Sequence, residues 1–570
     1  MSQPHERSKV KVGAEMRPTI IYTADGYTTR GKRLMGRQAA GEQFLRALTQ
    51  RYVDKPLNVL ALDGSDLDSI NTVFANLGYR GQLSCYTRSQ IDQSDTQLLY
   101  LPVPGIGEYA WRRLSLGEQA YSICGVTHTT ASHSVMESIS SLLTTPVRDW
   151  DALICTSTAV RESVNRILEP QVEFLKWKLG ATRFELPQLP IIPLGVHCED
   201  FEFTAQKRAK SRAELGVGET DIVLLFAGRL SFHAKAHPHP MFEAAQIVAE
   251  KLKESGRKLH LVQCGWYSNT SIEVAFKGYA DLIAPDVNII DLDGRVAQSR
   301  TTAWSSADIF ISLSDNIQET FGLTPIEAMA AGIPSVVSDW NGYKDTIEHG
   351  VTGFRVPTIM PPAGDGSEFA KRYDLRIDSY DIYCGHTCEL ISVDVGLTAL
   401  YLEKLAFAPE LRAQMGAEAK QRAKTLYEWK VVMQRYQNLW EELCERRHFA
   451  SKTLPSLGLR QAPHRPDPFH LYEGYPTDCL SGTTRLAVRK KISSADFREL
   501  ISSGVHNFAR FVLPTELEYL NLTESIATKR TVLLADLIDA IEDISAQRIR
   551  QVVAWLLKVG VLAVVYEENA

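Results

Sequence analysis

Four charged side chains, two basic and two acidic, stand where strand-like apolar runs of this sequence end or a helix-like run begins. Arg229 follows the run "IVLLFAG", and Lys235 lies six residues further on. A planar guanidinium fork and a lysine point charge suit a diphosphate. Glu319 and Glu327 lie eight residues apart, and carboxylates are natural acceptors for sugar hydroxyls. Each charge alone is ordinary; together they predict a site for a diphosphate-linked sugar.

The segment between the two acids is suited to hold an anion where a helix begins. Gly322 lets the backbone approach a ligand closely. The helix dipole and the free amides of Phe321, Gly322, Leu323 and Thr324 favour negative charge there. Thr324 can cap the helix or donate to a phosphate oxygen, and the following proline suits a first helical turn.

Strand-like and helix-like runs alternate along two consecutive stretches, residues 17–202 and 203–400. "PTIIYTA", "LNVLALDG" and "GEQFLRALTQRY" are typical of the first, and "DIVLLFAGRL", "KLHLVQCGW" and "IPSVVSD" of the second. Such alternation indicates parallel sheets covered on both faces. We therefore predict an α/β protein with two Rossmann-like domains facing across a cleft. Ligands of such sheets bind at the carboxyl ends of the strands.

The remaining segments are predicted to form smaller parts. They are a flexible lead at 1–16, a surface insertion at about 358–392, helices packing back on the core at 401–447, a linker at 448–470 and a mainly helical, winged-helix-like module at 471–570. The module shows a helix-turn-helix pattern followed by a hydrophobic strand. The module is not strongly basic, which argues against DNA binding. Peptide recognition, self-association and plain packing against the transferase core are the roles left open for it.

Composition excludes several classes of protein. The 570 residues are 44% hydrophobic and 23% charged, as in ordinary globular proteins. A net charge of -6 gives no general attraction to nucleic acid. Nine scattered cysteines in apolar runs favour a reducing cytoplasm. No stretch reaches the roughly 18–20 apolar residues of a membrane span, so only attachment at a membrane face stays open.

The order of motifs resembles the donor domain of family 4 glycosyltransferases, which have the GT-B fold. The order is "GR" with a lysine six residues on, then "ADIFISLSD", "ETFGLTPIEA", "GIPSVVSD" and "GVTGFRV". The N-terminal half resembles the family less closely. Its "TTRGKRLMGRQAAGEQFLRAL" is similar to a glycine-rich first loop before a long helix, with Gly36 and Gly41 as candidates, and "GVTHTT" supplies His128. The resemblance covers about residues 17–447.

The resemblance implies a role for each matching residue in retaining transfer from a nucleotide-diphosphate sugar. Arg229 and Lys235 would neutralise the departing diphosphate, Glu319 would bind sugar hydroxyls, and Glu327 would hold the ribose. The turn "LDGRV", with Arg295 and Val296, would contact the base. The other implied contacts are His128 beside the sugar, and Gly36, Gly41, Phe321, Gly322, Leu323 and Thr324 around the donor.

Two departures from the family pattern affect these roles. Thr320 stands where the family commonly has glycine, which predicts a different sugar specificity. "AKAHPHP" replaces the commoner Lys-Gly, so Lys235 matches less closely than Arg229 does.

No metal and no cofactor are expected, because the two cations do the neutralising. "DLD" at Asp291–Asp293 has the form of a metal pair but also of an ordinary strand-end turn. Cys384, His386 and Cys388 lack the partner pair that a zinc site usually needs.

Other functions stay open as alternatives. They are a GT-B sugar-nucleotide epimerase and a non-catalytic binding or scaffold protein with a degenerate transferase core. A phosphorylase would need a pyridoxal-phosphate lysine motif, which is not found. The acceptor is not specified, and a saccharide, lipid, small molecule or peptide is compatible with the sequence.

Overall fold

The computed structural model describes residues 15–27, 36–62, 67–453 and 458–566. The chain forms two compact units, residues 1–463 and 464–570. The predicted flexible lead falls almost wholly outside the described residues. Residues 28–35 of the glycine-rich loop also lie outside them.

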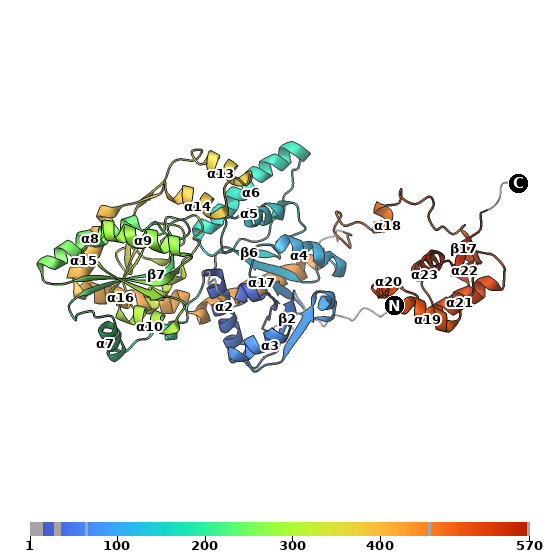
Figure 1. Ribbon diagram of the computed structural model, residues 1–570, viewed down its shortest axis with the longest axis horizontal. Helices are drawn as coiled ribbons and strands as arrows, with labels where there is room; N and C mark the ends of the chain where they lie inside the picture. The colour runs from blue at the N-terminus through green and yellow to red at the C-terminus, as the bar shows by residue number, and fades with distance from the viewer. Residues whose placement is uncertain (1–14, 28–35, 63–66, 454–457, 567–570) are drawn as a thin grey trace. The chain divides into compact units, whose positions relative to one another are not determined.

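The first half of the larger unit is built on a parallel sheet of six strands in the order β3-β2-β1-β4-β5-β6. Figure 1 labels β2 and β6 of this sheet. Its strands are β1 Thr19–Tyr22, β2 Leu57–Ala61, β3 Leu83–Thr87, β4 Leu98–Tyr100, β5 Ser122–Val126 and β6 Ala152–Ile154. The connecting helices are α1 Ala24–Tyr27, α2 Gly36–Arg51, α3 Leu67–Asn76, α4 Ile106–Arg113, α5 His133–Ser140 and α6 Thr158–Leu179.

The second half repeats this plan with a six-stranded parallel sheet in the order β12-β11-β10-β7-β8-β9. Its strands are β7 Ile222–Leu230, β8 Leu259–Tyr267, β9 Asn288–Asp293, β10 Ile309–Ser312, β11 Ser335–Ser338 and β12 Gly353–Val356. Its helices are α7 Ala205–Glu214, α8 His239–Glu254, α9 Thr270–Ile283, α10 Ala297–Ser306, α11 Leu323–Ala330, α12 Tyr343–Thr346, α15 Val395–Phe407 and α16 Pro409–Arg422.

Both sheets are doubly wound, with apolar cores on both faces. The first and fourth strands of each half are neighbours, β1 beside β4 and β7 beside β10. The connections leave in opposite directions there, and this switch point is where such sheets open a crevice for a ligand. Two doubly wound parallel sheets, each covered by helices, are the GT-B architecture, so the predicted fold class is confirmed.

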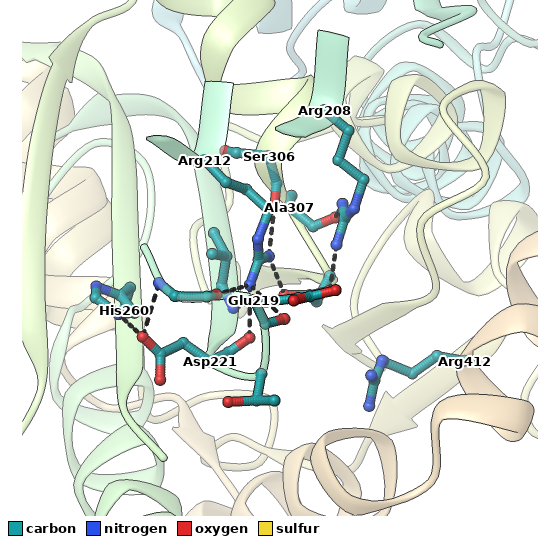
Figure 2. Close-up of polar contacts among 12 residues, drawn as sticks. Arg208, Arg212, Glu219, Asp221, His260, Ser306, Ala307 and Arg412 are labelled. Carbon is teal, nitrogen blue, oxygen red and sulfur yellow. Dashed lines mark hydrogen bonds and ion pairs between the residues drawn. The ribbon is translucent and has the colours of Figure 1, made fainter. Parts of the chain in front are cut away.

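An aspartate just before a strand ties neighbouring strands together at the amino ends of both sheets. Asp308, before β10, accepts the Val223 N–H of β7 at 2.9 Å and pairs with Arg212 at 2.9 Å. Figure 2 shows Arg212, which also donates to the carbonyls of Asp221 at 2.8 Å and Ser306 at 3.2 Å. Asp151, before β6, does the same in the first half. It accepts the Ile123 N–H at 2.9 Å.

The predicted surface insertion contains helices and short strands, although its sequence is rich in turn residues and shows no clear period. Helices α13 Ser367–Asp374 and α14 Tyr380–Cys388 lie between the short strands β13 Thr358–Ile359 and β14 Ser392–Val393. The segment also has buried residues, among them Tyr373 and Cys384. It is therefore a small helical substructure rather than an irregular surface loop.

Two predicted boundaries fall inside helices. α15 spans the boundary placed at residue 400 and packs its apolar face into the core of the second half, beside α8. α17 runs Trp429–Thr453, past the predicted start of the linker at 448. Its buried Trp429, Tyr436 and Trp440 join the core of the first half, so the chain crosses back to it.

The smaller unit has its own apolar core around a three-stranded antiparallel sheet in the order β16-β15-β17. Its elements are α18 Pro468–Leu471, β15 Arg485–Val488, α19 Ser494–Ser502, α20 Gly504–Asn507, α21 Glu516–Ala527, β16 Val532–Leu533, α22 Leu534–Asp539, α23 Ala546–Lys558 and β17 Leu562–Val564. The predicted helix-turn-helix followed by a strand is thus α22, α23 and β17. Within the described part of the chain, no helix combines the length and apolarity needed to cross a bilayer.

We expect Asp151→Ala to lower the free energy of unfolding by about 3–5 kcal/mol, because it leaves a buried arginine unpaired. Arg113 and Asp151 have fully buried side chains and are joined by contacts of 2.6 and 2.9 Å. Urea unfolding of the full chain measures the change. Asp149→Ala is the control, since that side chain is 56% exposed. Equal midpoints for the two variants would contradict this role of Asp151.

Candidate functional site

A cleft of about 1120 Å³ opens between the two halves of the larger unit. One wall consists of the carboxyl ends of β7 and β8 and the amino ends of α10 and α11. The other includes the start of α2 and the loop after β5. The cleft thus lies at the switch point between β7 and β10, where the strand order predicts it.

Lys235 and Glu319 form an ion pair inside this cleft. Their side chains are only 18% and 13% exposed. Burial alone would lower the pKa of Lys235, but the Glu319 carboxylate raises it above its usual range. Burial would likewise raise the pKa of Glu319, but Lys235 and the N–H groups of Thr320 and Phe321 hold it below its usual value. Both groups are therefore charged, and each compensates the other.

Arg229 lies beside this pair at the end of β7. Its guanidinium donates to Oε1 of Gln318 at 2.5 Å and to the Ala234 carbonyl at 3.2 Å. A guanidinium has five N–H donors, so these two contacts leave others able to face an anion in the cleft.

The start of α11 presents backbone to the cleft, as the sequence predicts. Gly322 has φ 85°, and a Cβ there would lie 2.2 Å from the Tyr343 ring, so only glycine fits. The buried hydroxyl of Thr324 has no hydrogen-bond partner among the residues that the structure describes, and it belongs to the lining. Phe321 also lines the cleft, but it is 1% exposed and packs in the core.

Glu327 lines the same cleft one helical turn further along α11. Burial raises its pKa to about 7, although the positive charge of Arg300 and a hydrogen bond with Gln43 act in the opposite direction. At neutral pH the carboxyl group is therefore poised between its two protonation states. A ligand that supplies hydrogen-bond donors would favour the carboxylate.

His128 reaches the cleft from the first half of the unit. Burial lowers its pKa to about 4, with Arg37 adding to the effect, so the imidazole is neutral at pH 7. Thr320 holds the loop that carries it, because the Thr320 hydroxyl donates to the His128 carbonyl at 2.7 Å. The Ser157 hydroxyl donates in turn to the Thr320 carbonyl at 2.7 Å. The threonine that replaces the family's glycine thus joins the two halves across the cleft.

Two of the thirteen predicted site residues do not line the cleft. Gly41 faces α1, where a Cβ would come 1.9 Å from the Gly26 carbonyl oxygen, so its place is a close helix contact. Val296 precedes α10 with 49% of its surface exposed to solvent. Arg295 does line the cleft, but it pairs with Asp293 at 2.8 Å. The predicted residues that the cleft brings together are His128, Arg229, Lys235, Glu319, Glu327, Gly36, Arg295, Phe321, Gly322, Leu323 and Thr324.

Several lining residues carry no signal in the sequence. Gln43 and Arg300 come from two different helices and act on Glu327. Tyr380 and Asp381 belong to the insertion and reach the cleft from α14. Gln43 lies in the run "GEQFLRALTQRY", whose pattern indicates a helix but not a site. The positions of Arg300, Tyr380 and Asp381 follow from tertiary packing, and no motif quoted above includes these three residues.

The metal-type side chains considered in the sequence are each held by other partners. Asp293 pairs with Arg295, whereas Asp291 lies 3.5 Å from Lys277. His386 lies 3.3 Å from Asp378. Among the described residues, one group could hold an ion, consisting of His197, Glu199 and Glu428. Arg46 already contacts this group, through a 3.0 Å pair with Glu199.

Residues 207–361 match a family model described as "Glycosyl transferases group 1". These residues include Arg229, Lys235, Glu319 and Glu327. This segment is therefore similar to the group 1 glycosyl transferases. The resemblance inferred from the motifs is thereby confirmed for these residues.

The chain is also similar to proteins named D-inositol 3-phosphate glycosyltransferase. It is 31% identical to one from Geodermatophilus obscurus over 177 residues, which is 29% of this chain and 36% of that protein. It is 32% identical to one from Saccharomonospora viridis over 168 residues, 29% of this chain and 37% of that protein. The chain therefore spans little more than a third of the length of these relatives.

Among solved structures, Anabaena Alr3699/HepE in complex with UDP and glucose aligns over 75% of this chain and all of its own, at 14% identity and TM-score 0.46. A sucrose-phosphate synthase from Thermosynechococcus elongatus aligns over 76% of this chain and all of its own, at 14% identity and TM-score 0.46.

We expect Glu327→Gln to flatten the dependence of stability on pH. The folded-state pKa of Glu327 is about 7 against an ordinary 4.5, so its contribution to stability is full below 4.5 and is lost as pH rises through 7. Between pH 5 and 8 the wild type should therefore lose about 2–3 kcal/mol more than the variant, at ~1.4 kcal/mol per pKa unit. Urea unfolding of the ligand-free chain at both pH values measures this. Parallel losses in the two proteins would show that Glu327 titrates normally.

Proposed function

We propose that this protein transfers a sugar from a nucleotide-diphosphate sugar to an acceptor hydroxyl, with retention at the anomeric carbon. The observation that carries the proposal is the convergence of Arg229, Lys235, Glu319 and Glu327 on one cleft at the switch point of the second sheet. A cleft of about 1120 Å³ exceeds the roughly 300–1,000 Å³ of common small-molecule sites and suits an extended donor.

The two cations would stabilise the diphosphate as it leaves. Negative charge grows on the bridging oxygen as the glycosidic bond breaks, and fixed cations in a largely buried site stabilise it more than water would. Arg229 supplies a planar fork and Lys235 a compact ammonium point charge. The N–H groups at the start of α11 add donors for phosphate or sugar oxygens. The Thr324 hydroxyl, which has no partner within the described part of the chain, adds another.

The two acids would hold the two sugars of the donor. Glu319 lies beside Lys235, so it would bind hydroxyls of the transferred sugar next to the diphosphate. Glu327 lies farther along α11 and would accept hydrogen bonds from ribose hydroxyls. Its pKa near 7 means that this interaction selects the ionised carboxylate.

Retention and independence of metal follow from the family resemblance and belong to the proposal. In front-side transfer, the leaving phosphate takes the proton of the attacking hydroxyl, so no protein base is required. The neutral imidazole of His128 would then serve as a hydrogen-bonding partner for the sugar. Neutralisation by Arg229 and Lys235 would stand in for a divalent cation.

The acceptor stays open in this proposal. The family model covers only the domain with the donor-binding residues. The relatives' name points to a phosphorylated cyclitol as one acceptor to test, but this chain covers little more than a third of their length. A thermal-shift screen with nucleoside diphosphates and their sugars identifies the donor, since a ligand that binds the folded state stabilises it. If no nucleotide sugar shifts the transition, the proposal fails.

We expect Glu319→Ala to lower kcat/KM for the donor by about 10²–10³-fold, because it removes a partner of the reacting sugar. The same variant frees Lys235, so the affinity for the nucleoside diphosphate should stay the same or rise. Turnover of the nucleotide sugar and calorimetric binding of the diphosphate measure the two effects. Glu348→Ala is the control, since its side chain is 54% exposed on the same domain. Wild-type turnover in the Glu319 variant would remove its proposed role.

A further inference from the structure

The helical insertion of the second half reaches the first half of the unit beside the cleft. The ring of Tyr373, on α13, stacks on His133 with centroids 3.8 Å apart. The His133 backbone N–H donates to the Tyr373 hydroxyl at 3.1 Å, and its ring Nε2 lies 3.0 Å from the Tyr373 carbonyl. This contact fixes the insertion against the start of α5, which follows the loop of His128.

The first residue of α14, Tyr380, lies inside the cleft itself. Its hydroxyl lies 3.3 Å from the Thr129 hydroxyl of the opposite half. The Gln318 side chain lines the same cleft and acts on the Tyr380 hydroxyl as a hydrogen-bond donor would, lowering its pKa against the effect of burial. Gln318 in turn accepts the guanidinium hydrogen bond of Arg229 at 2.5 Å. A row of side chains therefore runs from Thr129 through Tyr380 and Gln318 to Arg229.

The direction of these hydrogen bonds follows from the donors available. Arg229 has no acceptor, so Gln318 must turn its Oε1 toward it, which leaves the amide N–H₂ for the Tyr380 oxygen. The Tyr380 O–H can then donate to Thr129, whose hydroxyl also accepts the Ala131 N–H at 3.3 Å. Burial raises the pKa of Tyr380, so its proton is retained and the order is kept at neutral pH. Hydrogen bonds in such a row strengthen one another.

We propose that Tyr380 is a positioning residue that orients Arg229 for the leaving diphosphate through Gln318. Because Tyr380 also contacts Thr129, the orientation of Arg229 depends on the two halves being closed on each other. The inference rests on the proposed transfer reaction, in which Arg229 faces the diphosphate. It assigns a role to an insertion that the motifs of the sequence do not include.

The anchoring of α14 does not depend on the Tyr380 hydroxyl. The thiol of Cys388 donates to the Phe232 carbonyl at 3.6 Å, and Cys384 is fully buried. Tyr373 and Tyr383 stack with centroids 4.5 Å apart, which ties α13 to α14. Removing one hydroxyl from residue 380 should therefore leave the helix in place.

The test uses Tyr380→Phe, Gln318→Ala and their combination in the full-length chain. The readouts are the rate of hydrolysis of the donor identified by thermal shift, with water as acceptor, and the calorimetric Kd of its nucleoside diphosphate. We expect each single variant to lower kcat about tenfold, a typical loss for a positioned hydrogen bond, while the Kd changes less than about threefold. The kcat of the double variant should be at most about twentyfold below that of the wild type, because both substitutions interrupt the same row of hydrogen bonds.

Tyr383→Phe is the matched control, because it removes a hydroxyl from the same helix outside the cleft lining, and it should keep the wild-type rate. Thermal unfolding midpoints that match the wild type show that the variants are folded.

A wild-type kcat in Tyr380→Phe would overturn the proposal, as would a double variant about a hundredfold slower, since fully multiplicative losses mean independent residues. If the wild type hydrolyses no nucleotide sugar, the proposed function itself falls and this inference with it. Activity in the wild type separates that failure from a failure of the positioning role alone.

Discussion

The cleft depends on a lysine and a glutamate that are too deeply buried to be charged alone. Lys235 follows β7 and Glu319 follows β10, two strands that are neighbours only because the sheet reverses its winding there. Each charge compensates the desolvation of the other in the ligand-free protein. In the proposed reaction, a diphosphate entering the cleft would offer Lys235 a stronger partner and would leave Glu319 free to bind sugar hydroxyls. The ion pair therefore keeps two charged groups in a largely buried cleft, where either charge alone would be unfavourable.

The two ends of each sheet carry different tasks. At the amino ends, Asp151 and Asp308 accept backbone N–H groups from a neighbouring strand and pair with arginines, which ties the strands together. At the carboxyl ends of the second sheet the ionisable groups face a cleft instead. This division keeps the scaffold rigid while leaving cations, acids and the start of α11 available to a ligand.

The sequence was most informative where residue types and the order of motifs along the chain indicate the same site. All six strands of the second sheet and the four charges at its switch point follow from local pattern and motif order. Strand β4 has only three residues and carried too little pattern. The packing role of Gly41 and the cleft position of Tyr380 depend on segments far away in sequence, the latter on Thr129 and Gln318. Such contacts are tertiary and leave no local signal.

The most direct measurement of the central claim is a crystal structure of the full chain with its nucleoside diphosphate bound. The account predicts phosphate oxygens within hydrogen-bond distance of both Arg229 and Lys235, ribose hydroxyls on Glu327, and a Lys235 that no longer interacts with Glu319 alone. A diphosphate bound elsewhere, with the Lys235–Glu319 pair unchanged, would contradict it.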